Sequence, residues 1–474
     1  MCGIAGYLGK QFKDDVIIDR TFKALHHRGP DSKGYYHASD DFSNNLYLLH
    51  TRLNIIDIGE RSNQPYHLGA FTLIFNGEIY NYLEIKALLI KEGVSFETTG
   101  DTEVLIRALV QWGMEATLEK LEGMWAFAFY NKNSGNLYLC RDRFGEKPLY
   151  FTKQDDGIYF SSETKSLFKL LNRQLDFNFD QIHRYLINGY KSIYKKNNTF
   201  YNEVEEVGKG QWIKINKSLK FISGTYWKPN TKVNDTLTYK DSVEKVREDL
   251  YRSVSIRLRS DVPIAFCMSG GIDSNALISI ASREKGFDVH GFTIVNSDER
   301  YDEDNLVKKA VANLGIAHTS IPLQKKDFLK DLKTLVNAHN CPVYTITYFL
   351  QWKLMKAISE AGFKVSISGV GADELFTGYY DHGNLFLKSM FDNPETFNLA
   401  LEGWKKNHLP YVRNKHLRDP FLYINDPNFR DHIYDDSKIF SSFLNKEWHE
   451  NYHEKNYGLS LLRNRMLNEL FHEV

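Results

Sequence analysis

The chain has 474 residues, of which 42% are hydrophobic, 14% aromatic and 25% charged, a composition typical of a globular enzyme with two or three domains. Its 60 basic and 60 acidic residues cancel, which gives no support for a partner such as a nucleic acid or a membrane surface. No apolar run reaches the ~18 residues of a membrane span. The cysteines are too scattered for a disulfide framework or a paired metal site, so we expect a cytoplasmic protein: Cys2, Cys140, Cys267 and Cys341.

The first half of the chain contains short strand-like runs separated by Asn, Asp and Gly, which predict β-strands joined by turns. The expected strands are Ile4–Leu8, Leu46–Leu49, Phe71–Phe75, Leu137–Cys140, Leu149–Thr152 and Ile158–Ser161. Two stretches, Asn81–Lys91 and Thr102–Gly113, have helical periodicity. The pattern predicts two packed sheets with helices outside them.

The pattern changes after Tyr226–Leu237, a stretch without periodicity that reads as a linker. Beyond it, strands and helices alternate, which favours a doubly wound parallel sheet. The expected strands are Pro263–Met268, Val289–Val295, His318–Ile321 and Lys364–Ile367, and the expected helices are one from about Asp273, Glu303–Leu314, Asp327–Val336, Tyr348–Ala361 and several after Tyr380. We place the domains at residues 2–215 and 238–474, with a linker at 216–237.

Cys2 is the first candidate catalytic residue. If an aminopeptidase removes Met1, a thiol and an α-amine lie on one residue. The amine titrates near ~7.7 and the thiol near ~8.5, so the amine can act as a base for its own thiol. Taken alone, a cysteine at position 2 is usually an ordinary small buried residue. Its interpretation therefore depends on the residues that follow.

Polar segments further along the chain would complete a site around such a thiolate. A thiolate attacking an amide carbon needs oxyanion donors, which the side-chain amide of Asn76 and the backbone N–H of Gly77 could supply. Arg52 could bind a substrate carboxylate, while Glu78 and Asp101 could bind an ammonium. Glutamine is the small amide that carries both groups. Each segment separately also fits turn or cap chemistry, with Asp101 as a helix N-cap.

Two glycine-containing loops follow expected strands in the second half. In Ser269–Ser274 (SGGIDS), glycines let backbone N–H groups face an anion, and the N-terminus of the next helix adds partial positive charge. The loop has no Lys, unlike a P-loop, and its Asp273 suggests a Mg²⁺ contact beside phosphates. Ser368–Glu374 (SGVGADE) supplies a second carboxylate, Asp373, at the end of another strand. The alternative is a pair of glycine-rich turns before capped helices.

These motifs together resemble one family. The segments RGPDS, NGEIYNY, GDTE, EGMWAFAFY and RDRFGEKPLY are similar to the N-terminal-nucleophile glutaminase domain of class II glutamine amidotransferases. The two glycine-containing loops resemble the synthetase domain of asparagine synthetase, an ATP pyrophosphatase. The order of the two halves resembles that of the glutamine-hydrolysing asparagine synthetase family. It implies an α+β domain of two packed antiparallel sheets with flanking helices, followed by an α/β doubly wound domain.

The resemblance also implies residue roles. Cys2 would be the nucleophile, Asn76 and Gly77 the oxyanion hole, and Arg52, Glu78 and Asp101 would bind glutamine together with them. ATP would be a co-substrate and Mg²⁺ a cofactor, with Asp273 and Asp373 as metal ligands. The residues implied in binding ATP and pyrophosphate are Cys267, Ser269, Gly270, Gly271, Asp273, Ser274, Ile294, Ser368 and Gly369.

The implied reaction couples two steps. Glutamine is hydrolysed to glutamate and ammonia, and ATP activates an acceptor carboxylate as an acyl-adenylate, with release of pyrophosphate. Ammonia then forms the amide. L-Aspartate is the default acceptor, the partners are small molecules, and a homodimer is the candidate assembly. Releasing ammonia inside the protein avoids its protonation to ammonium, which is no nucleophile.

The chain departs from the family pattern at two places. Aspartate-using members carry Glu where this chain has Val370, and the resemblance implies that this Glu acts as a base. Relatives that amidate other carboxylates, such as uronic acids of surface polysaccharides, resemble the chain as closely. The family also continues, past a segment like residues 461–470, with an SxExRxPFLD stretch and a later Lys. We therefore expect a synthetase domain that is incomplete at the C-terminus.

Particular features of the sequence argue against functions of other classes. A glutamine-dependent sugar-phosphate aminotransferase shares the first domain and should lack the SGGIDS loop. If the protein were a non-catalytic sensor of glutamine or of a nucleotide, we would expect the nucleophile or the phosphate loop to be missing. Both are present. A lactam-forming relative has no use for Cys2. An ATP-dependent amide ligase that uses glutamine is the leading hypothesis.

Overall fold

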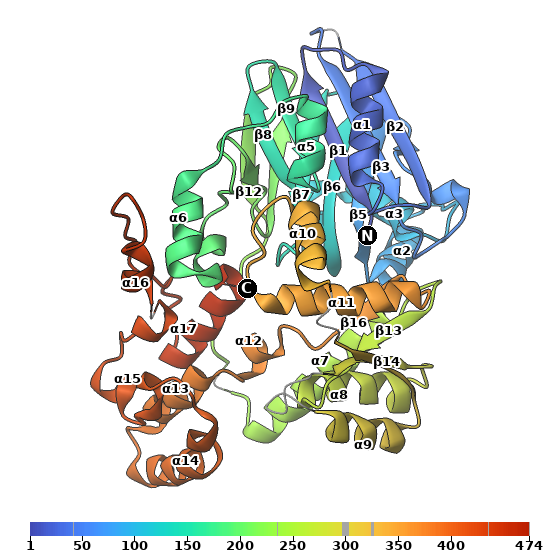
Figure 1. Ribbon diagram of the computed structural model, residues 1–474. Helices are drawn as coiled ribbons and strands as arrows, with labels where there is room; N and C mark the ends of the chain where they lie inside the picture. The colour runs from blue at the N-terminus through green and yellow to red at the C-terminus, as the bar shows by residue number, and fades with distance from the viewer. Residues whose placement is uncertain (41, 235, 296–302, 324–326, 435, 474) are drawn as a thin grey trace. The chain divides into compact units, whose positions relative to one another are not determined.

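The computed structural model describes residues 1–40, 42–234, 236–295, 303–323, 327–434 and 436–473. These residues form two compact units. The first unit comprises Met1–Phe177, Tyr201–Pro229 and Asp235–Ser368, and the second comprises Asn178–Phe200, Asn230–Asn234 and Gly369–Val474. The first unit contains three β-sheets, and the second is helical (Figure 1). None of the helices in the described ranges has the length and apolar character needed to cross a membrane.

Two six-stranded antiparallel sheets lie in the first half of the chain. Sheet 1 has the strand order β10 (Glu205–Glu206), β8 (Tyr150–Gln154), β9 (Gly157–Ser161), β1 (Gly3–Gly9), β3 (Asn45–Arg52), β2 (Ser32–Ser39). Sheet 2 has the order β12 (Phe221–Thr225), β11 (Gln211–Ile215), β7 (Asn136–Arg141), β6 (Gly123–Asn131), β5 (Phe71–Ile79), β4 (Tyr66–Leu68). The last hairpin, β11–β12, extends sheet 2 into residues 216–225, which had been expected to belong to the linker.

The two sheets share one apolar interior. Side chains alternate between the two faces of a strand, and the even-numbered residues of β1, β3 and β5 point into this interior, as Ile4, Leu48 and Ile74 do. The odd-numbered Leu73 and Phe75 belong instead to a second core on the outer face of sheet 2. This even-numbered alternation determines which residues of β1, β3 and β5 can meet between the sheets.

Helices cover both outer faces of this sandwich. Packed on sheet 1 are α1 (Asp15–Leu25) and α5 (Thr164–Leu171), and packed on sheet 2 are α2 (Tyr82–Lys91), α3 (Asp101–Trp112) and α4 (Met114–Lys120). A single 3₁₀ turn, η1 (Glu60–Ser62), precedes β4. The expected arrangement of two packed sheets with flanking helices is confirmed.

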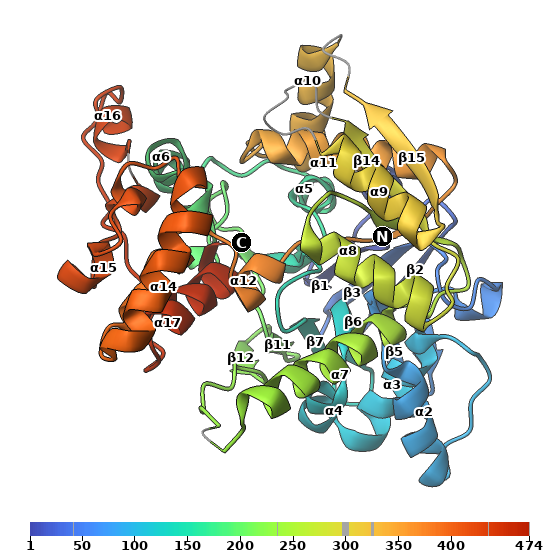
Figure 2. The same cartoon turned by 90° about the horizontal axis from the view of Figure 1, so that it is seen from below.

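Sheet 3 is parallel throughout, with the order β15 (Ala317–Pro322), β14 (His290–Val295), β13 (Ile264–Cys267), β16 (Val365–Ile367). Around it lie α7 (Tyr239–Arg257), α8 (Ile272–Ser279), the π-turn η3 (Ile280–Glu284), α9 (Asp304–Leu314), α10 (Phe328–His339) and α11 (Ile346–Glu360). Helices α7, α8 and α9 pack against one face and α11 against the other, which confirms a doubly wound sheet (Figure 2).

The strand order of sheet 3 creates a switch point between β13 and β16. From β13 the chain proceeds outward through β14 to β15 and then returns to β16 on the other side of β13. Open α/β sheets bind ligands outside the carboxyl ends of the strands at such a point. The loops that follow β13 and β16 begin at Met268 and Ser368, so both expected phosphate loops start at this switch point.

The second unit combines two early segments, of which Asn178–Phe200 is the longer, with the chain from Gly369 onward. The longer early segment forms α6 (Phe179–Asn188) and η2 (Tyr190–Lys195). The late segment forms α12 (Ala372–Phe376), α13 (Tyr380–Met390), α14 (Pro394–Asn407), α15 (Leu422–Asn425), α16 (Ser437–Ser441), α17 (Leu461–Asn468), the short turns η5 (Leu409–Tyr411), η6 (His416–Arg418) and η7 (Asp431–Ile433), and the π-turn η8 (Glu469–Glu473). Several helices after Tyr380 were expected, and they are present.

Candidate active site

A polar region closes one end of the interior between sheets 1 and 2. On β3 the inward-facing series runs from Leu48 to His50 and Arg52, and on β5 it runs from Ile74 to Asn76 and Glu78. Gly3 pairs with Thr51, so Cys2 reaches the end of β3. The even-numbered alternation that builds the core thus brings Cys2, Arg52, Asn76 and Glu78 to one place. These are four of the residues expected from the sequence.

Hydrogen bonds fix both the side chain and the backbone carbonyl of Cys2. Its Sγ accepts a hydrogen bond from the backbone N–H of Leu53 at 3.4 Å, and its carbonyl oxygen accepts one from Arg28 Nε at 2.9 Å. Burial raises the pKa of the thiol. Burial, helped by the positive charges of Arg28 and Lys147, lowers the pKa of the Met1 amine to about 5. At neutral pH the thiol is therefore protonated and the amine is an uncharged base.

Asn76 has a buried side-chain amide that no described residue satisfies. It is only 1% exposed, and neither Oδ1 nor Nδ2 makes a hydrogen bond within the described ranges. A buried polar group without a partner costs about 1–3 kcal/mol, so such a group points to a ligand that would satisfy it. The neighbouring Gly77 has no room for a side chain, since a Cβ there would lie 2.1 Å from the carbonyl oxygen of Met124.

Two carboxylates lie beside this amide. Asp101 is the first residue of α3 rather than its N-cap, which is Gly100, and its Oδ2 accepts a hydrogen bond from the Ile79 N–H at 2.9 Å. Burial raises the pKa of Asp101 to about 6. Burial and the nearby charge of Asp101 raise the pKa of Glu78. Two carboxylates that oppose each other's ionisation favour a bound cation.

Arg52 is a fixed positive charge at the end of β3. Its two terminal nitrogens donate to the carbonyl oxygens of Ile56, Asp57 and Gly59 and to Asn63 Oδ1. Burial lowers the pKa of the guanidinium, and the nearby carboxylates of Asp57 and Asp101 offset part of this effect. The side chain therefore organises the loop that follows β3 and also places a charge beside Cys2.

Several residues of this region were not singled out from the sequence. Arg28 contacts Cys2 and pairs with Glu163 at 2.9 Å, and Lys147 lies beside Met1 with 3.2 Å between its Nζ and the methionine sulfur. His50 bridges the two sheets, because its Nε2 lies 3.1 Å from the Phe75 carbonyl oxygen. Period-two alternation from Arg52 would have indicated His50. Arg28 and Lys147 lie in the segments RGPDS and RDRFGEKPLY, which were noted without a role for either residue, and their contacts with Cys2, Glu163 and Met1 span long sequence separations.

The loop after β13 is closed by its own side chains. Ser269 Oγ lies 3.0 Å from Ser274 Oγ and accepts from the Gly271 N–H at 3.1 Å. Asn275 Nδ2 donates to the carbonyl oxygens of Ser269 and Gly271. Gly271 is the N-cap of α8, so Ile272 and Asp273 begin the helix beside the loop.

The other expected ATP-site residues lie on neighbouring strands of sheet 3 or in the second unit. Cys267 ends β13, where it pairs with Phe292, Ile294 lies in β14, and Ser368 follows β16. Gly369 and Asp373 belong to the second unit, in which Asp373 lies in the first turn of α12. The sheet therefore collects the residues from Cys267 to Ser274 together with Ile294 and Ser368.

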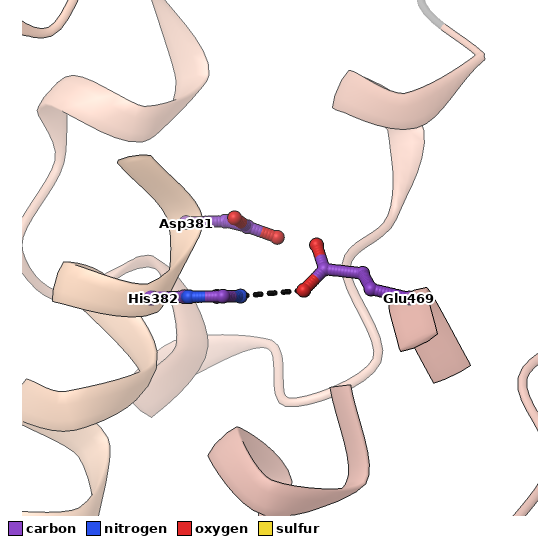
Figure 3. A group of neighbouring side chains, drawn as sticks. All are labelled: Asp381, His382 and Glu469. Atoms are coloured by element: carbon purple, nitrogen blue, oxygen red, sulfur yellow. Dashed lines mark hydrogen bonds and ion pairs between the residues drawn. The ribbon is translucent and has the colours of Figure 1, made fainter. Parts of the chain in front are cut away.

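A separate buried cluster of titratable side chains lies in the second unit. Asp381, His382 and Glu469 are close enough to share a cation, and His382 Nε2 lies 2.7 Å from Glu469 Oε2 (Figure 3). Arg465 already supplies that positive charge: its guanidinium lies 3.1 Å from Asp381 Oδ2 and 2.9 Å from Glu469 Oε1. It also pairs with Glu473 at 2.7 Å. We therefore interpret this cluster as a buried ion network.

Comparison with known proteins agrees with this architecture. Residues 1–227 match the glutamine amidotransferase domain family, and residues 245–460 match the asparagine synthase family. Asparagine synthetase [glutamine-hydrolyzing] 1 of Bacillus subtilis is 32% identical over 466 residues, covering 95% of this chain and 70% of the relative. Asparagine synthetase [glutamine-hydrolyzing] 3 of the same organism is 28% identical and covers 88% of this chain and 70% of the relative. Amidase chry2 of Gibberella zeae is 27% identical, and the match covers 80% of this chain and 59% of that relative.

The two matched families together define a glutamine-dependent ligase that uses ATP as a co-substrate. The chain belongs to the glutamine-hydrolysing asparagine synthetase family.

Proposed function

We propose that this chain hydrolyses glutamine at Cys2 and uses the ammonia to convert an ATP-activated carboxylate into an amide. The observation that carries the first half is the buried amide of Asn76, which no described residue satisfies, at the same polar end of the sandwich as Cys2. Family membership supports the coupling of the two halves.

In the glutaminase half, removal of Met1 gives Cys2 a free α-amine, which takes the thiol proton. The thiolate then attacks the amide carbon of glutamine. Asn76 Nδ2 and the Gly77 N–H donate to the oxyanion that forms, where donors of this kind act strongly because water is excluded. Arg52 binds the substrate carboxylate, and Glu78 and Asp101 bind its ammonium. The C–N bond breaks, ammonia leaves with the proton, and water hydrolyses the thioester to glutamate.

In the synthetase half, an oxygen of the acceptor carboxylate attacks the α-phosphorus of ATP and the bond to the β-phosphate breaks. The loop Ser269–Ser274 binds the departing pyrophosphate, the backbone at Cys267, Ile294 and Gly369 contacts the adenosine, and Ser368 also belongs to the ATP site. Ammonia attacks the acyl carbon, and AMP leaves with the bond electrons. Asp273 and Asp373 offer only carboxylate oxygens, the ligands that Mg²⁺ prefers, so this donor set suits Mg²⁺, which would neutralise phosphate charge when bound.

L-Aspartate is the first candidate acceptor, since the relatives in Bacillus subtilis are named for asparagine synthesis. A second candidate is another carboxylate, such as a uronic acid. Val370 favours the second candidate because valine cannot accept a proton, and it is 71% exposed. One relative of comparable identity, amidase chry2 of Gibberella zeae, is not named for asparagine synthesis.

Cys2→Ala tests the glutaminase half. We expect it to abolish ammonia release from glutamine and, in a chain able to complete the synthetase reaction, to leave ammonia-dependent pyrophosphate release intact. Cys341→Ala is the matched control, since burial raises the pKa of that thiol to about 11 and Cys341, unlike Cys2, has no α-amine that could take its proton. Ammonia release that survives Cys2→Ala would show that the nucleophile is another residue.

A panel of carboxylates tests the acceptor. Pyrophosphate release from ATP is measured with aspartate, glutamate, glucuronate and galacturonate, each with ammonium chloride in excess. Release with a uronate and not with aspartate would support the second candidate. Robust turnover with aspartate would contradict the inference drawn from Val370.

A further inference from the structure

His50 stands between the apolar core and the polar end of the sandwich. It follows Leu48 and precedes Arg52 in the inward-facing series of β3, and it is 1% exposed. Its Nε2 lies 3.1 Å from the carbonyl oxygen of Phe75, which can only accept, so Nε2 carries the hydrogen. Burial lowers the pKa of His50 to about 3, so the ring is neutral at physiological pH. The mechanism above gives this residue no role.

The backbone of Phe75 is held on both its polar atoms. The carbonyl oxygen accepts from His50, and the N–H donates to Gln64 Oε1 at 2.6 Å. Gln64 is itself anchored, since its Nε2 donates to Thr102 Oγ1 at 3.3 Å. Phe75 directly precedes Asn76 and Gly77, so these two side chains add to the pairing of β5 with β6 in holding the oxyanion donors in place.

The same strand that carries His50 carries the charge expected to bind the substrate carboxylate. Strands rise about 3.3–3.4 Å per residue, so His50 and Arg52 are roughly 7 Å apart along β3. Arg52 would bind one end of glutamine, and the donors of Asn76 and Gly77 would bind the other. His50 joins the two strands that present these ends.

We propose that His50 is a positioning residue that sets the length of side chain the glutaminase accepts, so that glutamine is hydrolysed and asparagine is not. The inference rests on the proposed function of Cys2, Arg52 and Asn76. Asparagine carries the same carboxylate, ammonium and amide and is shorter by one methylene. One methylene is typically worth about 10–200-fold in discrimination when a pocket is rigid.

The test compares two substitutions of His50 whose side-chain amide nitrogens lie at distances from the backbone that differ by one bond. In His50→Gln the amide nitrogen lies as many bonds from the backbone as His Nε2 does, so the bond to Phe75 can be kept. In His50→Asn the nitrogen lies one bond closer and cannot reach. Ammonia release gives kcat/KM for glutamine and for asparagine, and their ratio is the readout. A loss of stability alone lowers both values together and leaves the ratio unchanged.

We expect His50→Gln to keep the ratio within about threefold and His50→Asn to lower it by about tenfold or more. His67→Asn is the control, since His67 is exposed on β4 and contacts Thr72. If His50→Asn fails to fold, Gln64→Met releases the other side of Phe75 and should lower the ratio in the same way. An unchanged ratio in the folded variant, or an equal fall in both His50 variants, would overturn the inference. Failure of the proposed function is seen separately, as glutamine hydrolysis that survives Cys2→Ala.

Discussion

The backbone N–H of Gly270 donates a hydrogen bond to the carboxylate of Glu303 at 2.7 Å. Gly270 belongs to the loop after β13, and Glu303 is the N-cap residue of α9. A side-chain anion therefore lies where we propose that pyrophosphate binds. Bound phosphates would compete with Glu303 for the same donor, and the two negative charges repel each other.

Glu303→Gln is expected to tighten ATP binding. The substitution removes the competing charge and keeps the size of the side chain. A hydrogen bond is worth about 0.5–1.5 kcal/mol net, so the apparent KM for ATP should fall about two- to tenfold. Pyrophosphate release at varied ATP measures it, with Glu360→Gln at the exposed end of α11 as control. A raised KM would mean that Glu303 assists binding.

Asn76→Ala is expected to separate activity from stability. Loss of an oxyanion donor should lower kcat for glutamine hydrolysis by about 10²–10³. The same change removes a buried amide that has no partner among the described residues, so the free energy of unfolding should stay level or rise by about 1–3 kcal/mol. Asn81→Ala is the matched contrast, because Asn81 is hydrogen-bonded to Lys120 and Glu122 and its loss should destabilise. Full activity in Asn76→Ala would argue against the oxyanion hole.

Glutamine affinity is expected to depend on pH through Asp101. Burial raises the pKa of Asp101 to about 6, so the carboxylate is ionised above that pH and protonated below it. Protonation removes one partner of the substrate ammonium, so KM for glutamine should rise as pH falls below about 6, by at most about tenfold per unit for one proton. Asp101→Asn, which can still accept from Ile79, should show a higher KM that depends less on pH between 8 and 5, with the remaining dependence due to Glu78, whose pKa burial also raises. An undiminished pH dependence in that variant would assign the titration to a group other than Asp101.

Arg465→Met is expected to destabilise the second unit. The guanidinium is fully buried among Asp381, Glu469 and Glu473, and its removal leaves buried carboxylates unpaired. Breaking a buried pair from one side costs about 3–5 kcal/mol. Denaturant unfolding, followed by the exposure of buried tryptophan, measures the loss. Arg463→Met changes an exposed arginine on the same helix and should cost under about 0.5 kcal/mol.

The sequence predicts elements well where local periodicity and burial agree. The helix expected at Asn81–Lys91 is α2, with Asn81 as its N-cap, and the strands of sheet 3 lie within one or two residues of their expected bounds. The strand β2 was missed because its residues, SKGYYHAS, alternate between half-buried and exposed positions. The strand β12 was missed because it is a largely exposed edge strand, whose place is determined by its pairing with β11.

Some residues of the candidate site can be predicted from the sequence and others cannot. Cys2, Arg52 and Asn76 stand out because their residue types suit one reaction and the motifs around them are distinctive. Glu303 and His50 do not stand out, because each acts through a backbone group far away in the sequence, Gly270 and Phe75 respectively. Only tertiary structure reveals such pairs, since a backbone acceptor has no residue type to recognise.

The even-numbered alternation of β3 and β5 also limits how this enzyme can change in length. Deleting one residue from the middle of either strand would turn the downstream site residues to the opposite face of their sheet, whereas deleting two would only shorten the strand. Viable insertions and deletions within these strands should therefore come in even numbers, while the loops between strands are free of this constraint. Among homologues, strand segments that vary in length only by even numbers of residues should therefore be those that contain site residues.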